Sequence, residues 1–173
     1  MKFKKILAAI DLSPMTTTVF DQALKLAKQE EASLKLFHCL RWRGINQDAL
    51  LLIGANVSHN VALDEELRQH RQERLQDETH QTRTLLEGWC QQAAKQGVFA
   101  EFDYNVGEPG PLICGAARSW GADLIVLGRR GLKGLPEAWL GSVSNHVVHH
   151  APCSVLVVQG DALPSGYINV HEG

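Results

Sequence analysis

The sequence predicts an α/β fold in which helices cover both faces of one parallel sheet. Strand-like and helix-like segments alternate along the chain in the order βαβαβαβαβ, and this alternation is typical of parallel sheets. The segment 123–128 (DLIVLG) is almost entirely apolar, as expected of a strand that is buried on both faces. The chain has 173 residues, of which 45% are hydrophobic, so it can bury a core within one domain.

The first strand is expected at 3–10 (FKKILAAI). Its apolar run reaches Asp11 after too few residues for a signal peptide. Ser13 and Pro14 then predict the start of a helix, because serine caps helices and proline fits their first position. A periodic apolar face carries this helix to about residue 29.

The middle of the chain predicts two strands on either side of a long polar helix. The segment 33–40 (SLKLFHCL) is the second strand, and 99–106 (FAEFDYNV) is the third. The helix between them is expected at 64–96 and ends at Gly97. Its apolar side chains gather in its C-terminal half, so that half should pack best against the sheet.

Two further helices and one strand are expected after the third strand. One helix begins at Gly110 and ends at Gly121. The other is 142–150, which Pro152 terminates. The last strand is 154–158 (SVLVV), and the tail at 160–173 is expected to be loosely held.

Composition and charge exclude several classes of function. The net charge is −2, so no broad basic surface favours nucleic-acid binding. No apolar run approaches the roughly 18 residues of a membrane span. Together with the absence of a secretion signal, this predicts a cytoplasmic protein without nucleic-acid or membrane partners.

The cysteines and histidines do not follow the spacing of common metal sites. The cysteines are Cys39, Cys90, Cys114 and Cys153. In a cytoplasmic chain they are expected to be reduced. His146 and either His149 or His150 are close enough on a helix to share a metal, but no carboxylate is interleaved with them. We interpret them as the polar end of a helix and predict no metal site.

The glycine-rich segment 128–142 (GRRGLKGLPEAWLGS) follows the buried fourth strand and ends at a predicted helix start. Glycines such as Gly128 and Gly131 allow a turn with exposed N–H groups, and helix N-termini favour anions such as phosphate. Neither a GxxxxGK[ST] motif nor a GxGxxG motif occurs. The spacing alone therefore leaves open a phosphate site or an ordinary surface loop. Nearby side chains that could add charge or hydroxyl donors are Arg129, Arg130, Lys133, Ser142 and Ser144.

The pattern Gly128-x2-Gly131-x9-Gly141-Ser142 resembles the nucleotide-binding signature of the universal stress protein family, in its ATP-binding branch. Other segments resemble the family in matching order. They are KKILAAIDLSP, KLFHCL, GEPGPLICGAA, GADLIVLGRRG and GSVSNHVVHHAPCSVLVV. The resemblance covers residues 2–159 apart from 41–63, and it defines a single domain at 1–159 followed by the tail.

The resemblance implies a five-stranded parallel sheet in the order 3-2-1-4-5, similar to Rossmann folds and to adenine nucleotide alpha hydrolases. It also implies that ATP, with Mg²⁺ or Mn²⁺ at the phosphates, lies where the first and fourth strands diverge. The residues expected to bind the nucleotide are Ala9, Asp11, Cys39, Leu127, Gly128, Arg129, Arg130, Gly131, Gly141, Ser142, Val143 and Ser144.

The resemblance also gives roles to these residues. Asp11 should bond the ribose, and the backbone of Cys39 should meet the adenine edge. Ala9 and Leu127 should line the floor, while the glycines and the segment Gly141–Ser144 should hold the phosphates. An aspartate after a strand can also cap the next helix. Ser13 is better placed for that cap, which leaves Asp11 available for a ligand.

Two regions of the chain suggest contacts beyond the nucleotide. The segment 41–63 is long and apolar, so it either packs inside the domain or forms an interface. Members of the family commonly dimerise through the last strand, and Ser154–Gln159 is apolar enough to pair across a two-fold axis. We therefore expect a homodimer.

No nucleophile, base and acid occur at a spacing that would support catalysis, so no catalytic residue is predicted. The resemblance implies an ATP-binding stress-response switch that acts through dimerisation and protein contacts, with at most slow ATP hydrolysis. The alternatives are a nucleotide-independent dimeric interaction module and a weak ATPase or adenylyl-transferring enzyme. Adenylyl transfer would favour an HxGH-type motif after the first strand, where DLSPMTT has no histidine.

Overall fold

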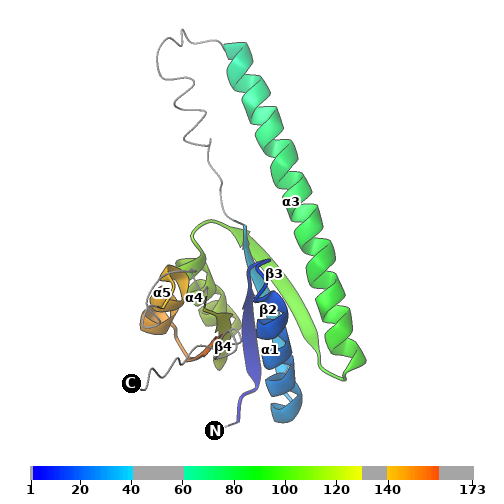
Figure 1. The fold of residues 1–173 in the computed structure, drawn as a ribbon, viewed down its shortest axis with the longest axis vertical. Coiled ribbons are helices and arrows are strands. Elements are labelled where there is room, and N and C mark those ends of the chain that lie inside the picture. Colours follow the sequence, from blue (N-terminus) through cyan, green and yellow to red (C-terminus); the bar gives the residue numbers. More distant parts are fainter. Residues whose placement is uncertain (1, 41–60, 130–139, 160–173) are drawn as a thin grey trace, which may run out of the picture.

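A computed structural model describes residues 2–40, 61–129 and 140–159. Predictions for Arg130, Gly131, most of 41–63 and the tail therefore lie outside the described residues. Five strands form one parallel sheet in the order β3-β2-β1-β4-β5 (Figure 1), which confirms the predicted fold class and order. The strands are β1 (Lys5–Ile10), β2 (Ser33–Leu40), β3 (Ala100–Val106), β4 (Leu124–Gly128) and β5 (Ser154–Val158).

Helices cover both faces of this sheet (Figure 1). On one face lie α1 (Thr16–Glu30) and α3 (Val61–Lys95); on the other lie α4 (Pro109–Trp120) and α5 (Ser142–His150). β1 supplies both cores because side chains alternate along a strand. Ile6 and Ala8 pack with α1 and α3, whereas Leu7 packs with α4 and α5. Fully burying one such aliphatic side chain contributes about 1.5–3 kcal/mol.

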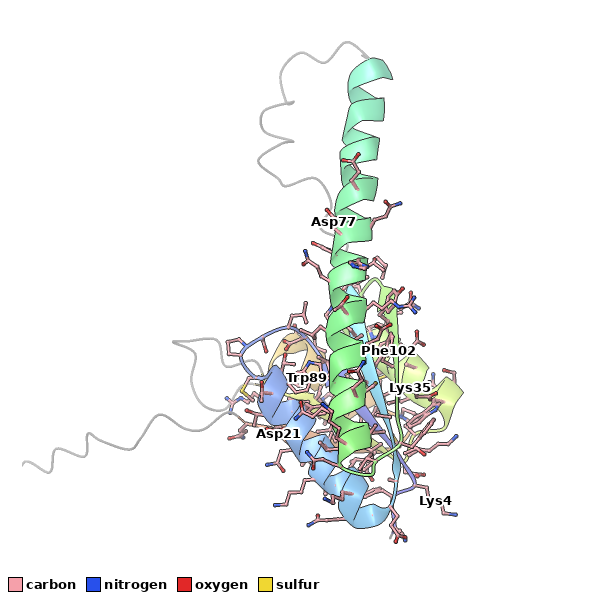
Figure 2. All side chains as sticks on the ribbon, turned by 90° about the vertical axis from the view of Figure 1, so that its right-hand side faces the viewer. Lys4, Asp21, Lys35, Asp77, Trp89 and Phe102 are labelled. Atoms are coloured by element: carbon pink, nitrogen blue, oxygen red, sulfur yellow. The ribbon has the colours of Figure 1, made fainter. Side chains whose placement is uncertain are left out.

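The long helix α3 contacts the sheet through its C-terminal half, as its sequence predicts. Leu86 is fully buried there, and the ring of Trp89 lies 4.3 Å from that of Phe20 in α1. The N-terminal half extends past the sheet (Figures 1 and 2). α3 begins at Val61, three residues before the predicted start, so residues 61–63 belong to the helix.

Asp123 holds the amino end of β1. Its carboxylate Oδ2 accepts hydrogen bonds from the backbone N–H groups of Lys4 and Lys5, at 2.8 and 2.9 Å. Lys5 Nζ donates to the Trp120 carbonyl at 2.9 Å and lies 5.3 Å from the Trp120 ring centre. Lys35 Nζ lies 5.0 Å from the same ring. Protein groups therefore occupy this end of the sheet, and β1 begins at Lys5 rather than at residue 3.

None of the helices in the described ranges combines the length and apolar character that a membrane span requires. The same ranges contain no group of three or more His, Cys, Asp or Glu side chains placed to hold a metal ion. The rings of His146 and His150 stack on each other, with centres 4.2 Å apart. His150 Nδ1 also lies 2.8 Å from the His146 carbonyl oxygen, so both rings are engaged along α5.

Candidate functional site

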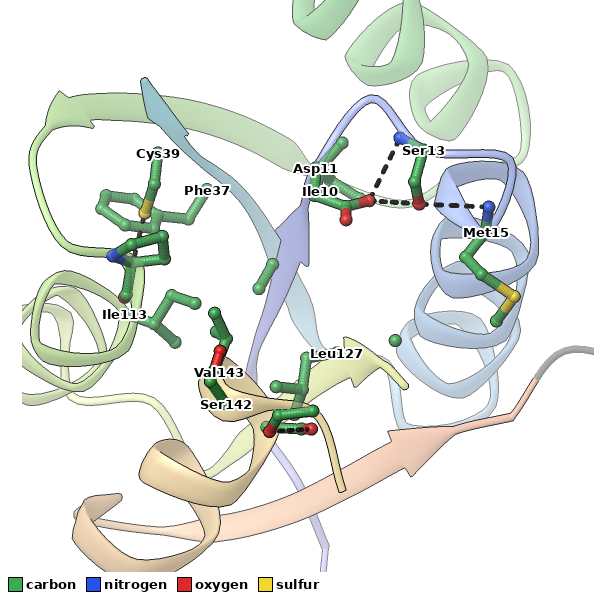
Figure 3. Close-up of a pocket in the computed structure, with 15 residues that line it drawn as sticks. Ile10, Asp11, Ser13, Met15, Phe37, Cys39, Ile113, Leu127, Ser142 and Val143 are labelled. Carbon is green, nitrogen blue, oxygen red and sulfur yellow. Dashed lines mark hydrogen bonds between the residues drawn. The ribbon is translucent and has the colours of Figure 1, made fainter. Parts of the chain in front are cut away.

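A cavity of about 240 Å³ opens at the carboxyl ends of the strands (Figure 3). It lies beside β1 and β4, where the strand order reverses. This is the position at which open α/β sheets bind ligands. Its described lining is Ala9, Ile10, Asp11, Ser13, Met15, Phe37, Cys39, Pro109, Ile113, Leu127, Gly128, Gly141, Ser142, Val143 and Ser144.

The structure brings together most of the residues that the sequence predicts for the site. Nine of them line the cavity, and they are Ala9, Asp11, Cys39, Leu127, Gly128, Gly141, Ser142, Val143 and Ser144. Arg129 does not line it, and its backbone N–H donates to the Val158 carbonyl at 2.8 Å. Arg130 and Gly131 lie outside the described residues.

The turn between β1 and α1 forms one side of the cavity. Asp11 Oδ1 accepts hydrogen bonds from Ser13 Oγ at 2.5 Å and from Ser13 N–H at 3.2 Å (Figure 3). Ser13 Oγ in turn accepts from the Met15 N–H at 3.2 Å. Leu12 between them has a φ of 47°, in the left-handed region. The carboxylate at the cavity is therefore fixed by its own turn.

The predicted start of α1 directly after Ser13 is wrong. The helix begins at Thr16, and its N-cap is Met15, which makes no side-chain cap bond. Ser13 Oγ still accepts from the Met15 N–H ahead of the helix, and its hydroxyl donates to Asp11, because serine and aspartate bond readily to nearby groups in turns. Asp11 is consequently engaged by Ser13, contrary to the expectation that a Ser13 cap leaves it available.

The start of α5 forms the opposite side of the cavity. Gly141 is its N-cap, and its carbonyl accepts from the Asn145 N–H at 2.8 Å. Ser144 is 2% exposed, and its hydroxyl donates to the same carbonyl at 2.9 Å. The first N–H groups of a helix have no acceptor within the helix, and the helix dipole adds partial positive charge there. This side of the cavity is therefore suited to an anion.

An apolar wall connects these two sides. Phe37 and Cys39 come from β2, and Ile113 comes from α4 (Figure 3). The thiol of Cys39 donates to the Pro109 carbonyl, with 3.9 Å between sulfur and oxygen. The wall is suited to a flat apolar group such as a nucleobase. Sequence reasoning missed Phe37, Pro109 and Ile113, because nothing local in their segments marks them as ligand-facing.

Gly128 lets α1 approach the end of β4. A Cβ atom at this position would lie 3.1 Å from Val19 Cγ2 and 3.6 Å from Met15 Cβ. A larger side chain would push α1 away and change the shape of the cavity. The glycine therefore has a packing role as well as its place in the predicted turn.

A second hollow of about 420 Å³ lies beyond Val143. It shares Pro109, Ser142 and Val143 with the first cavity. Gly110 borders it, and a Cβ atom there would lie only 2.7 Å from the His146 ring. The starts of α4 and α5 therefore meet by close packing of glycine on histidine.

The described cysteines outside the cavity have raised thiol pKa values. Burial raises the pKa of Cys90 to about 11, with a smaller contribution from Glu101. Burial also raises the pKa values of Cys114 and Cys153. A thiol with a raised pKa remains protonated at neutral pH and is a poor nucleophile or metal ligand.

Comparison with known proteins identifies the family. A model described as the universal stress protein family matches residues 2–159. The chain belongs to the universal stress protein family. A universal stress protein of Synechocystis sp. is 40% identical over 159 residues, which cover 92% of this chain and 99% of the relative. Universal stress protein YxiE of Bacillus subtilis is 37% identical, with 91% and 99% covered.

Solved structures of universal stress proteins have the same fold. UspA from Lactobacillus plantarum is similar with a TM-score of 0.69 at 23% identity, covering 91% of this chain and 99% of that one. A family member from Arabidopsis thaliana with AMP bound gives 0.59 at 23% identity, covering 92% and 93%. A universal stress protein in complex with cAMP gives 0.58 at 19% identity, covering 92% and 98%. These likenesses concern the fold.

Proposed function

We propose that this universal stress protein binds ATP in the cavity of Figure 3 and acts as a nucleotide-dependent switch in a stress response. The observation that carries the proposal is the arrangement of the cavity. An apolar wall, a fixed carboxylate and a helix N-terminus surround one space at the point where the strand order reverses. The AMP and cAMP complexes of two structural relatives support an adenine nucleotide as the ligand.

Each side of the cavity is assigned to one part of the nucleotide. The adenine ring packs on the wall that Phe37 and Cys39 supply, and the Asp11 carboxylate accepts hydrogen bonds from the ribose hydroxyls. The phosphates bind at the start of α5, at Gly141 and Ser142, where the first N–H groups of the helix have no acceptor within the helix. Mg²⁺ or Mn²⁺ would accompany the phosphates and offset their charge.

Binding rather than catalysis fits the described part of the site. Among the described lining residues, Asp11 is the one carboxylate, and Ser13 engages it. ATP hydrolysis requires a metal ion and a positioned water at the γ-phosphate. We therefore propose at most slow hydrolysis, with ATP acting as a conformational ligand of a cytoplasmic protein.

The proposed switch acts through a homodimer that pairs β5 across a two-fold axis. β5 lies at one edge of the described sheet, and Leu156 on this strand is 37% exposed. An apolar edge strand is a site at which two sheets can join. Its neighbour β4 reaches the cavity at Leu127 and Gly128, so a nucleotide is one strand away from the interface.

Calorimetric titration of the purified chain with ATP, AMP and cAMP, with and without Mg²⁺, tests this proposal. Adenine nucleotide that co-purifies with the protein, detected by absorbance and chromatography, would support it independently. Gly141→Val should abolish phosphate-dependent affinity, because the valine side chain occupies the space at the helix start. The backbone of Gly141 (φ −59°, ψ 157°) tolerates any residue, so the fold should survive.

Gly115→Val is the matched control. Gly115 lies in α4, and a Cβ atom there would meet nothing within 4 Å. It should bind ATP as the wild type does. If the wild type gives neither heat nor a thermal shift with any of the nucleotides, the protein is a nucleotide-independent interaction module. Rapid release of phosphate or pyrophosphate would instead favour the enzymatic alternatives.

A further inference from the structure

The carbonyl of Ile10 at the end of β1 is bonded by a buried histidine. His38 of β2 is the register partner of Ile10 and is only 6% exposed. Its Nδ1 lies 2.7 Å from the Ile10 carbonyl oxygen. A carbonyl can only accept a hydrogen bond, so Nδ1 carries the proton and the imidazole is the donor. This interaction fixes the peptide that leads directly into Asp11.

The turn after Ile10 needs such support. Leu12 has a φ of 47°, which a branched side chain adopts only where the surrounding contacts hold it. On the far side of the turn, Ser13 donates to the Asp11 carboxylate and accepts from the N–H of Met15. On the near side, His38 holds Ile10. Hydrogen bonds therefore fix the residue before Asp11 and the residue two positions after it.

His38 acts from outside the cavity. It is not among the residues that line the cavity, whereas its neighbours Phe37 and Cys39 are. Side chains alternate along a strand, so His38 projects to the opposite face of the sheet. Its surroundings there are the core of α1 and α3, to which Leu34 and Leu36 of the same strand face contribute.

We propose that His38 is a positioning residue that sets the ligand affinity of the cavity through Asp11. This inference rests on the proposed nucleotide site. The Nδ1–H group holds the Ile10–Asp11 peptide in the orientation that directs the carboxylate toward the ribose. Without it, the turn relaxes and the carboxylate must be ordered when the ligand binds. The cost of that ordering reduces affinity.

Three substitutions of His38 separate the hydrogen bond from simple packing. His38→Leu fills the space without a donor, and AMP affinity should fall about five- to tenfold, as expected for one lost hydrogen bond. His38→Asn places an amide N–H near the position of Nδ1 and should restore affinity to within about twofold of wild type. His38→Gln places its amide nearer the position of Nε2 and should restore less.

A control variant and a double-mutant cycle test whether His38 changes AMP affinity through Asp11. Leu34→Ala removes a buried side chain from the same face of β2. It should lower the melting temperature while leaving AMP affinity unchanged. In an Asp11→Ala background, His38→Leu should have no further effect on affinity, because the group through which it acts is missing.

The outcomes distinguish this inference from the proposed function. If the wild-type chain does not bind AMP, the proposed nucleotide site is wrong, and the positioning role fails with it. If the wild type binds and His38→Leu keeps full affinity, only the positioning role is wrong. An equal loss of affinity with and without Asp11 would also overturn it. Should His38→Leu fail to fold, equal affinities of the Asn and Gln variants would do the same.

Discussion

An aspartate lies at each end of β1, and the two carboxylates have different partners. At the amino end, Asp123 accepts hydrogen bonds from the N–H groups of Lys4 and Lys5, and protein groups fill the space around it. At the carboxyl end, Asp11 bonds within its own turn and lines a cavity. The backbone groups that lie beside each carboxylate explain the difference. The groups beside Asp123 are the backbone N–H groups of Lys4 and Lys5, which a carboxylate can accept from, whereas the group before Asp11 is the Ile10 carbonyl, which an ionised carboxylate cannot satisfy.

The carboxyl end of β1 therefore needs a donor, and His38 supplies it to the Ile10 carbonyl. Asp11 cannot cap this end of the strand, so its carboxylate remains at the cavity surface. The comparison teaches that an aspartate beside a strand must be interpreted together with the backbone groups that it faces. At the amino end the carboxylate is bonded to the backbone of β1, and at the carboxyl end it lines the cavity.

The largest expected effect on stability comes from Asp123, at the amino end of β1. Asp123→Ala removes the acceptor from two backbone N–H groups, and it should lower the free energy of unfolding by about 2–4 kcal/mol. Urea denaturation measures this loss, with Asp21→Ala on the exposed face of α1 as control. AMP affinity should be unchanged. A loss of affinity without a loss of stability would reverse the assignment of the two aspartates.

The close contact between Gly110 of α4 and His146 of α5 gives the next largest expected effect on stability. Gly110→Ala places a Cβ atom 2.7 Å from the His146 ring, and shifting that ring should destabilise the fold by about 1–3 kcal/mol. Gly115→Ala in the same helix meets nothing within 4 Å and should be neutral or stabilising. Thermal unfolding compares the two variants. Adding His146→Ala should relieve the clash, and no relief would mean that the strain lies elsewhere.

Asp11→Ala provides the reverse of the Asp123 experiment. We expect AMP affinity to fall about tenfold, which is about 1.4 kcal/mol, while the free energy of unfolding changes little. Isothermal titration and urea denaturation on the same preparation measure the two quantities. Asp11→Asn should be intermediate because it keeps an acceptor for Ser13 but loses the charge. A purely structural Asp11 would give the opposite pattern.

The smallest expected effect is a pH dependence of stability from Cys90, which packs against the core between the sheet and the helices α1 and α3. Burial raises the pKa of Cys90 from an ordinary 9.0 to about 11. The folded state thus holds this proton more tightly than the unfolded state, so stability is lost as the pH rises from about 9 to about 11. Iodoacetamide at pH 8 should label Cys90 slowly in the folded chain and quickly in urea. Fast labelling of the folded chain would show that α3 does not bury this thiol against the rest of the core.

The sequence predicts the architecture well because the signals that begin and end its helices and strands are local. The helix 142–150 and the strands 33–40 and 154–158 have the predicted bounds. Strong breakers and continuous apolar runs define them, and these signals do not depend on the rest of the fold. The start of α1 is different. The bonds of Ser13 to Asp11 and to Met15 form a turn ahead of the helix, and the residue at which that turn ends depends on a geometry that residue type does not specify.

Some residues of the candidate site could likewise be identified from the sequence, and others could not. Glycine spacing and family resemblance identify Gly128, Gly141 and the start of α5, which lie along one segment of the chain. Phe37 and Ile113 reach the cavity from separate elements, so only the assembled sheet shows them as neighbours. His38 faces away from the cavity, and its hydrogen bond to Ile10 has no local signal in the sequence.

The projection of α3 has a consequence for hydrogen exchange. The helix has 35 residues and is about 52 Å long. Its packing on the sheet begins near Thr82, which is 1% exposed. Toward Val61 the helix extends past the described sheet, so we expect its amides to open more readily, by fraying. Protection should therefore rise steeply along a single helix, with deuterium entering its first turns long before the amides near Ala93.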